Sequence, residues 1–131
     1  MTNTYYFAKT LKNMSFDDAV ERVTEVLKAE GFGILTDIDV QATMKKKLDL
    51  DFRRYRILGA CNPPLAHQAL EAEDKIGTML PCNVIVQQHS EGVIEVAAID
   101  PVASMASVGN PALAKLASAV RDKLSAVVDA L

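Results

Sequence analysis

The period of the hydrophobic pattern changes at Gly31, and this change limits the folds that the chain can adopt. From residue 15 to residue 30 the apolar side chains recur every three or four positions, which predicts an amphipathic helix with Ser15 as its N-cap. Gly31 is expected to end this helix in the left-handed conformation. From residue 32 to residue 40 the apolar side chains recur at every second position, which predicts a half-buried strand. The buried face of this strand is expected to carry Phe32, Ile34, Ile38 and Val40.

The same two periods recur through the rest of the chain. Further strands are expected at residues 5–10, 55–61, 82–88 and 93–99, and further helices at residues 41–48, 63–73 and 111–130. Connecting segments are expected at residues 76–81 and 102–110. The predicted order is β-α-β-(short α)-β-α-β-β-α, in one domain that comprises residues 1–131. Because each apolar helix stripe needs a surface to cover, this order predicts the α+β class, with a single mostly antiparallel sheet and helices packed on it.

The composition limits the class of function. Half of the 131 residues are hydrophobic and 24% are charged, which is typical of a globular domain that needs no metal or disulfide to hold its core. The net charge of −3 argues against a protein that binds nucleic acid. The chain has four Phe, three Tyr and no Trp, so a base-stacking surface is not expected either.

The termini and the cysteines predict a cytoplasmic protein. The first residues carry neither a basic nor an apolar stretch of the kind found in signal peptides, and no run of apolar residues is long enough to span a membrane. In a chain without an export signal, Cys61 and Cys82 are expected to be free thiols. We therefore expect no membrane partner.

Several short motifs resemble a known family. Residues 58–66 read Leu-Gly-Ala-Cys-Asn-Pro-Pro-Leu-Ala, residues 80–84 read Leu-Pro-Cys-Asn-Val, and Asp100 precedes Pro101. With a Ser-Phe-Asp-Asp-Ala-Val helix start and a Gly-Phe-Gly-Ile-Leu-Thr strand upstream, the chain resembles the domain-of-unknown-function 302 family over about residues 5–130. The resemblance implies an α+β fold like that of the TATA-binding protein and association into homodimers. It implies no particular activity, and a shared fold does not imply DNA binding.

Two Cys-Asn pairs form the main candidate site. Cys61 and Asn62 end one predicted strand, and Cys82 and Asn83 begin the next, so the four side chains meet if those strands are antiparallel neighbours. Strand alternation places both thiols on the inward face, Cys61 with Tyr55 and Ile57, and Cys82 with Val84 and Val86. The four residues are then expected to line a small polar pocket. Alternatively, the cysteines are small core residues, and the asparagines cap a helix and hydrogen-bond at a strand end.

The residues after Cys61 predict a helix start. Asn62 is expected to be the N-cap, followed by Pro63 at the first helical position. Free N–H groups at such a helix start favour an anion, so they are expected to lower the pKa of the Cys61 thiol or to hold a polar ligand. The apolar side of this helix, which is expected to be buried, carries Leu65, Ala66, Ala69 and Leu70.

These features allow two functions. The first is a non-enzymatic module that binds a small ligand or a partner through the cluster of Cys61, Asn62, Cys82 and Asn83, with His67 nearby. The alternative is a thiol-dependent redox protein or enzyme that uses Cys61 with Cys82 as its partner. His67 and Glu71 are four positions apart and resemble the base and acid of a catalytic trio, but an exposed helical pair is the simpler interpretation.

The remaining polar clusters predict no cofactor. Cys61 and Cys82 are 21 positions apart, whereas structural zinc sites use four ligands in close pairs, so we expect no metal site. Six basic residues lie between positions 45 and 56, with two aspartates among them, and are expected to form a solvated face. They are Lys45, Lys46, Lys47, Arg53, Arg54 and Arg56. The expected partners are therefore a second copy of the chain and an unidentified small ligand.

Overall fold

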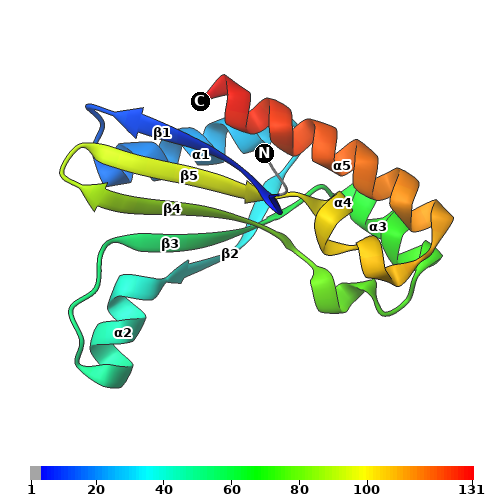
Figure 1. Ribbon diagram of the computed structural model, residues 1–131, viewed down its shortest axis with the longest axis horizontal. Helices are drawn as coiled ribbons and strands as arrows, with labels where there is room; N and C mark the ends of the chain where they lie inside the picture. The colour runs from blue at the N-terminus through cyan, green and yellow to red at the C-terminus, as the bar shows by residue number, and fades with distance from the viewer. Residues whose placement is uncertain (1–3) are drawn as a thin grey trace.

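The fold is built around one five-stranded sheet. The structure, a computed structural model, describes residues 4–131. The strands run in the order β1-β5-β4-β3-β2, and all neighbouring pairs are antiparallel (Figure 1). Their bounds are Tyr6–Lys12 for β1, Gly33–Asp39 for β2, Tyr55–Cys61 for β3, Cys82–Ser90 for β4 and Val93–Ile99 for β5. The predicted α+β class with a mostly antiparallel sheet is confirmed.

The helices follow the predicted order, with short additions. The α-helices are α1 (Phe16–Ala29), α2 (Val40–Leu48), α3 (Pro63–Ala72), α4 (Pro101–Ser104) and α5 (Pro111–Ala130). Both segments that were expected to be irregular contain helical turns: η1 (Ile76–Met79) in the first, and α4 and η2 (Ala106–Val108) in the second. Each α-helix begins at a side chain that accepts a hydrogen bond from the first turn, which satisfies a backbone donor that has no partner within the helix. These N-caps are Ser15, Asp39, Asn62, Asp100 and Asn110.

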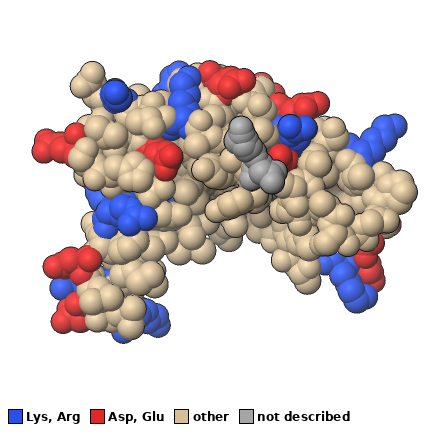
Figure 2. Space-filling model, in the orientation of Figure 1, with Lys and Arg blue, Asp and Glu red and all other residues tan. Residues whose placement is uncertain are grey.

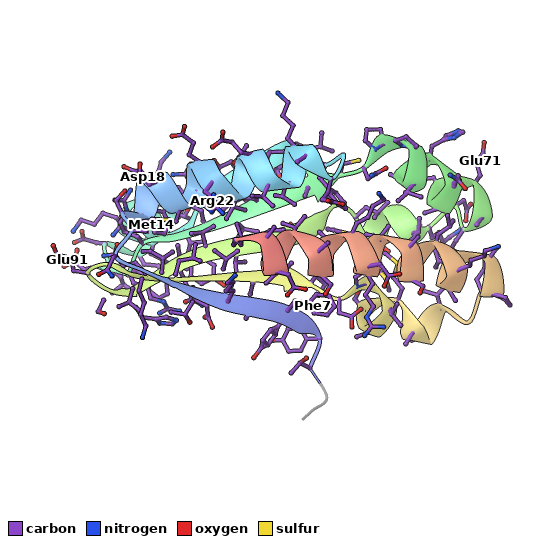
Figure 3. The ribbon with its side chains drawn as sticks, turned by 90° about the horizontal axis from the view of Figure 1, so that it is seen from above. Phe7, Met14, Asp18, Arg22, Glu71 and Glu91 are labelled. Carbon is purple, nitrogen blue, oxygen red and sulfur yellow. The ribbon has the colours of Figure 1, made fainter. Side chains whose placement is uncertain are left out.

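Helices α1 and α5 lie side by side over one face of the sheet (Figure 3). Val23 and Leu27 of α1 and Leu124 of α5 are fully buried against the strands. The Arg22 guanidinium of α1 also donates a hydrogen bond to the Ala130 carbonyl at the end of α5, at 3.0 Å. The predicted apolar stripes of the two long helices are therefore the surfaces that cover the sheet.

The buried face of β3 is the opposite of the predicted one. Leu58 and Ala60 are the β3 residues in the core on the helix-covered face, whereas Tyr55 and Ile57 lie on the opposite face, which no long helix covers. The prediction that Tyr55 and Ile57 point inward was wrong, because both faces of this strand carry apolar residues. The alternation therefore defines two faces without deciding which of them is buried.

The prediction that Ile34 and Ile38 share the buried face of β2 was wrong, because the strand contains a bulge. The pairing with β3 shifts between Ile34 and Thr36, so that Ile34 lies opposite Ala60 but Ile38 lies opposite Ile57. Ile34 therefore packs against the core, whereas Ile38 is on the uncovered face and 48% exposed. An extra residue in one strand reverses the alternation beyond it, which the apolar spacing alone did not indicate.

Beyond one end of the sheet the chain forms a second apolar cluster. In Figure 3, Glu71 on α3 marks this end of the molecule, and Glu91 in the β4–β5 turn marks the other. The cluster comprises Ala69, Ile76, Met105, Leu113 and Ala117, which come from α3, η1, the end of α4 and the first half of α5. Helix α5 therefore covers the sheet with its last turns and this second cluster with its first turns.

Candidate functional site

A cavity of about 320 Å³ lies where the end of the sheet meets α3, η1, α4 and α5. Its wall includes Phe32, Ala60 and Cys82 from the core on the sheet, and Leu113 and Ala117 from the second cluster. The cavity is thus the junction between the two clusters. The other lining residues are Leu35, Cys61, Asn62, Leu65, Ala66, Ala69, Leu70, Gly77, Leu80, Pro81, Pro101, Met105, Leu116 and Val120.

Small side chains keep this space open. Ala60 lies at the end of β3, Ala66 and Ala69 line the wall on α3, Gly77 lies in η1 and Ala117 lies on α5. A larger side chain at any of these positions would extend into the space between the elements. Protein interiors are otherwise close-packed, so these small residues are what leaves the space between the elements unfilled.

The lining is apolar. Among the described residues that form the wall there is no Lys, Arg, His, Asp or Glu, and Asn62 carries the only side-chain amide. The predicted polar pocket was therefore wrong in its chemistry. Cys61, Asn62 and Cys82 do reach one cavity, but aliphatic side chains surround them.

Asn62 caps α3, and the start of that helix has few donors to offer. The Asn62 Oδ1 accepts a hydrogen bond from the Leu65 N–H at 3.3 Å, and the Ala66 N–H donates to the Asn62 carbonyl at 2.9 Å. Pro63 and Pro64 have no N–H group. The predicted free N–H groups at this helix start are therefore absent from residues 63–66. These residues therefore offer no free N–H group to the Cys61 thiol or to an anion.

The two cysteines occupy neighbouring strand ends, as predicted, but the predicted shared inward face was wrong for Cys61, because strand alternation places it on the face of Tyr55 and Ile57. Ala60 of β3 pairs with Cys82 of β4, and Cys61 follows directly in the chain. Cys82 is 8% exposed, whereas Cys61 is half-buried. Burial raises the pKa of the Cys82 thiol to about 11, and the nearby Cys61 contributes to the shift. Cys82 is therefore protonated at neutral pH and behaves as a core side chain.

Asn83 and His67 lie away from the cavity. Asn83 is exposed on the uncovered face of the sheet, beside a shallow hollow that Tyr55 and Ile85 also line. The His67 Nε2 lies 3.4 Å from the Glu71 Oε1, and the two side chains are 75% and 74% exposed. His67 and Glu71 do not line the cavity that both thiols border, and the simpler interpretation of a surface helical pair fits their positions.

Sequence reasoning missed most of the cavity wall. Met105 was expected in a connecting segment, and Leu70 was expected on the buried side of α3, but Leu70 is 43% exposed. Leu35 is 66% exposed at the bulge of β2. The sequence does contain one signal for the cavity, which is the set of small residues on β3, α3, η1 and α5. These residues indicate a cavity only when the structure shows that the elements face one another.

Three of the six basic residues of the segment 45–56 contact acidic side chains. Lys45 contacts Asp49 and Asp51 at 3.0 and 3.5 Å. The Arg54 guanidinium lies 2.7 Å from the Asp17 carboxylate, and the Arg56 guanidinium lies 2.5 Å from the Asp37 carboxylate. These acidic residues offset part of the positive charge of the segment, so the segment does not form a continuous basic surface.

Residues 4–131 contain neither a cluster of metal-binding side chains nor a helix suited to span a membrane. In that part of the chain, no three His, Cys, Asp or Glu side chains are grouped closely enough to hold a metal ion. Its helices are also too short or too polar to cross a bilayer.

Comparisons with known proteins place the chain in a family. The crystal structure of an uncharacterized conserved protein DUF302 from Bacillus stearothermophilus superimposes with a TM-score of 0.88 and 29% sequence identity, covering 97% of this chain and 98% of that chain. None of the curated proteins compared with the chain matches it. The sequence model of one family, described as Domain of unknown function DUF302, matches residues 7–131. The chain therefore belongs to the DUF302 family.

Proposed function

We propose that the protein binds a small apolar molecule in the cavity between the end of the sheet and helices α3 and α5. The observation that carries this proposal is an opening of about 320 Å³ whose wall is formed almost entirely by apolar side chains. Its volume falls within the range of small-molecule sites, which is about 300–1,000 Å³. Such sites are typically lined by apolar residues with few polar groups, as this one is.

The exposed leucines at the cavity support the same interpretation. Leu35 and Leu70 line it and are 66% and 43% exposed. A bound apolar molecule would cover part of this surface and gain the free energy of removing it from water. The alternative thiol-dependent function has less support, because the pKa of Cys82 is raised and residues 63–66 at the start of α3 offer no free N–H group to Cys61.

Binding can be tested with the neutral fluorescent probe N-phenyl-1-naphthylamine, whose emission rises in apolar sites. We expect saturable binding to the wild-type protein and a loss of at least about tenfold in affinity in Ala117→Phe, which fills the cavity. Ala66→Phe fills it from the opposite wall and serves as a second variant. Ala114→Phe is the matched control, because Ala114 is exposed on the same helix as Ala117.

Circular dichroism and thermal melting establish that each variant is folded before its affinity is compared. Equal probe affinity in the folded Ala66→Phe or Ala117→Phe variant and in the wild type would contradict the proposal. So would the absence of saturable binding to the wild type.

We also propose that the protein forms a homodimer through the uncovered face of the sheet. This face carries Tyr6, Ile38, Ile57 and Ile85, and the exposed fractions of Tyr6 and Ile38 are 39% and 48%. In Figure 2 the molecule is hollowed beneath the sheet, between α2 and the end formed by η1 and α4, and few charged side chains surround the hollow. The family resemblance to proteins that associate as dimers supports the same proposal.

The size of this face is sufficient for a dimer. Five strands of about seven residues give a surface of roughly 23 Å by 24 Å, or about 550 Å² per protomer. Two copies would bury about 1,100 Å², just above the roughly 1,000 Å² expected of a specific interface. Sedimentation equilibrium is expected to give a dimer for the wild type and a monomer for Ile85→Lys. The control Ala126→Lys, on the exposed side of α5, should remain dimeric.

We further propose a cytoplasmic location. There the reducing conditions would keep Cys61 and Cys82 as thiols. Fractionation of the producing cells, with antibody detection of the protein, tests this location.

A further inference from the structure

We infer that two copies of the chain pack through the uncovered face of the sheet with their two-fold axis along β4, the central strand. In this arrangement β3 of each copy faces β5 of the other, and Arg53 of one copy pairs with Glu95 of the partner subunit. The inference rests on the proposed homodimer and adds its orientation and the residues that select it. Two independent observations carry it: the sizes of the apolar side chains on this face and the positions of the charged ones.

One row of apolar side chains crosses the uncovered face from large to small. The strand pairing aligns Ile38, Ile57 and Ile85 on β2, β3 and β4 with Ala97 on β5 and Ala8 on β1. The side chains therefore project further on the β2 side of β4 than on the β1 side. A two-fold axis along β4 places Ile57 of one copy opposite Ala97 of the partner subunit, so that large side chains meet small ones across the interface.

The other possible axis gives a poorer fit. In the aligned packing of two sheets the strand directions stay within about 30° of each other, so the two-fold axis runs either along the strands or across them. An axis across the strands would place β3 against β3 and β5 against β5. Ile57 would then face a second Ile57, and Ala97 would face a second Ala97, which crowds one pair and separates the other. Because the cores of stable interfaces are packed as closely as protein interiors, the axis along β4 is favoured.

The neighbouring row carries opposite charges on the two sides of β4. Gln87 on β4 lies between Tyr55 on β3 and Glu95 on β5. Arg53 precedes β3, and its guanidinium carbon lies 5.5 Å from the centre of the Tyr55 ring. The Arg53 Nε donates a hydrogen bond to the Gln87 Oε1 at 2.9 Å, and the Gln87 Nε2 donates to the Glu95 Oε1 at 2.9 Å. The Gln87 amide thus holds the two charged groups on opposite sides of the central strand.

Both charged groups can accept a partner from a second copy. Within residues 4–131, Arg53 is exposed and takes part in no ion pair. The hydrogen bonds of Glu95 in the same part of the chain, to Gln87 and His89, all use its Oε1. Rotation about β4 brings Arg53 of each copy to Glu95 of the partner subunit, which gives two ion pairs per dimer. Opposite charges that face each other across an interface fix its register, because the alternative registers leave them unmatched or bring like charges together.

Charge reversal at each position tests this register. Sedimentation equilibrium compares the wild type with Glu95→Arg and with Arg53→Glu, each of which would place two pairs of like charges in the dimer. We expect each variant to dimerise at least about tenfold more weakly than the wild type. Circular dichroism and thermal melting establish that each variant is folded before the affinities are compared.

Mixing the two variants provides the decisive measurement. In a heterodimer of Glu95→Arg and Arg53→Glu each positive side chain meets a negative one, so we expect the heterodimer to recover the wild-type affinity. Native mass spectrometry separates the three dimers by mass, and the heterodimer should dominate. The matched control mixes Lys115→Glu with Asp122→Lys, at two exposed positions on α5, and should give the three dimers in statistical proportions. Statistical proportions in the first mixture, or undiminished dimerisation of both single variants, would overturn the inference.

These outcomes remain distinct from those of the proposed homodimer. A wild-type protein that stays monomeric, or a dimer that Ile85→Lys leaves intact, would overturn the proposed interface and the inferred orientation together. A dimer that Ile85→Lys dissociates, but whose charge-reversed variants show no preference for the heterodimer, would leave the interface in place and show that its orientation is wrong.

Discussion

Ala60 on β3 lies directly opposite Cys82 on β4, and this pairing fixes the Cys82 side chain on the helix-covered face of the sheet. Cys61 is the next residue in the chain, at the end of its strand, and is half-buried. Both thiols line the same cavity and both precede an asparagine. The pairing of the strands therefore gives two cysteines in similar sequence contexts different solvent exposure.

The two thiols should be alkylated at different rates. At pH 8 roughly one Cys82 thiol in a thousand is ionised if its pKa is about 11, and the side chain is 8% exposed. We expect iodoacetamide to modify Cys61 first, as followed by mass spectrometry of the Cys61 and Cys82 peptides. In Cys61→Ser only slow modification should remain, whereas Cys82→Ala should retain the fast reaction. Faster modification of Cys82 would show that its burial is not maintained in solution.

The buried Cys82 thiol should also make stability depend on alkaline pH. The pKa of Cys82 is raised in the folded protein, so folding favours the protonated thiol. The contribution of this thiol to the free energy of unfolding is complete below about pH 9. It is lost as the pH rises towards about 11, because the unfolded thiol ionises first. We expect the free energy of unfolding to fall by about 2 kcal/mol more in the wild type than in Cys82→Ala over this interval. Urea denaturation at a series of pH values measures the difference, and parallel curves would contradict it.

Gly59 should be intolerant of a side chain, unlike Gly33. A Cβ on Gly59 would lie 2.1 Å from the Thr36 Oγ1 and 2.7 Å from the Pro81 Cγ, whereas a Cβ on Gly33 would meet nothing within 4 Å. We expect Gly59→Ala to lower the free energy of unfolding by about 2 kcal/mol, because Thr36 and Pro81 must move. Gly33→Ala, the matched control in the neighbouring strand, should change it by less than about 0.5 kcal/mol. Equal effects of the two variants in urea denaturation would show that the close packing over Gly59 is absent.

The ion pair between Arg56 and Asp37 should stabilise the edge of the sheet modestly. The Arg56 Nε and Nη2 donate to the two Asp37 carboxylate oxygens at 2.7 and 2.5 Å, and this hydrogen bonding lowers the pKa of Asp37. The contribution of this ion pair to the free energy of unfolding is therefore present above about pH 4. It is lost as the pH falls through the lowered pKa of Asp37. Because the Asp37 side chain is 39% exposed, we expect less than about 1 kcal/mol at neutral pH.

The measurement for this pair compares Asp37→Asn with the wild type at pH 6 and pH 3. The difference in the free energy of unfolding should shrink at the lower pH. Asp122→Asn, at an exposed position on α5, should show no such change. A constant difference for Asp37→Asn would mean that the Asp37 charge contributes nothing.

The helix and strand boundaries could be predicted because their signals are local. Ser15 accepts a hydrogen bond from the Asp18 N–H, as expected of an N-cap, and Gly31 has the left-handed φ of 88° that ends α1. Asn62 begins α3, and Gly92, with a φ of 74°, lies in the β4–β5 turn. Each signal involves a residue and neighbours within a few positions, so the sequence is sufficient to place it.

The buried face of each strand could be predicted only where one of the two faces was polar. In β4 the apolar face of Cys82, Val84 and Val86 alternates with Asn83, Ile85 and Gln87, of which two are polar, and the prediction was confirmed. In β3 both faces are apolar, so the choice depended on where α1 and α5 pack. The bulge in β2 similarly depends on the space between Thr36 and Gly59, which belong to different strands.

The sequence by itself determined the order of the elements, their approximate limits and the family, because caps, turns and short motifs act over a few residues. Only the tertiary structure decided which strand faces are covered, why Asn83 and His67 lie outside the site, and that the cysteines border an apolar cavity. That cavity is formed by small residues on β3, α3, η1 and α5, which are far apart in the sequence. Its volume depends on how closely these elements approach one another, and that distance is set by the packing of the whole core rather than by any local pattern.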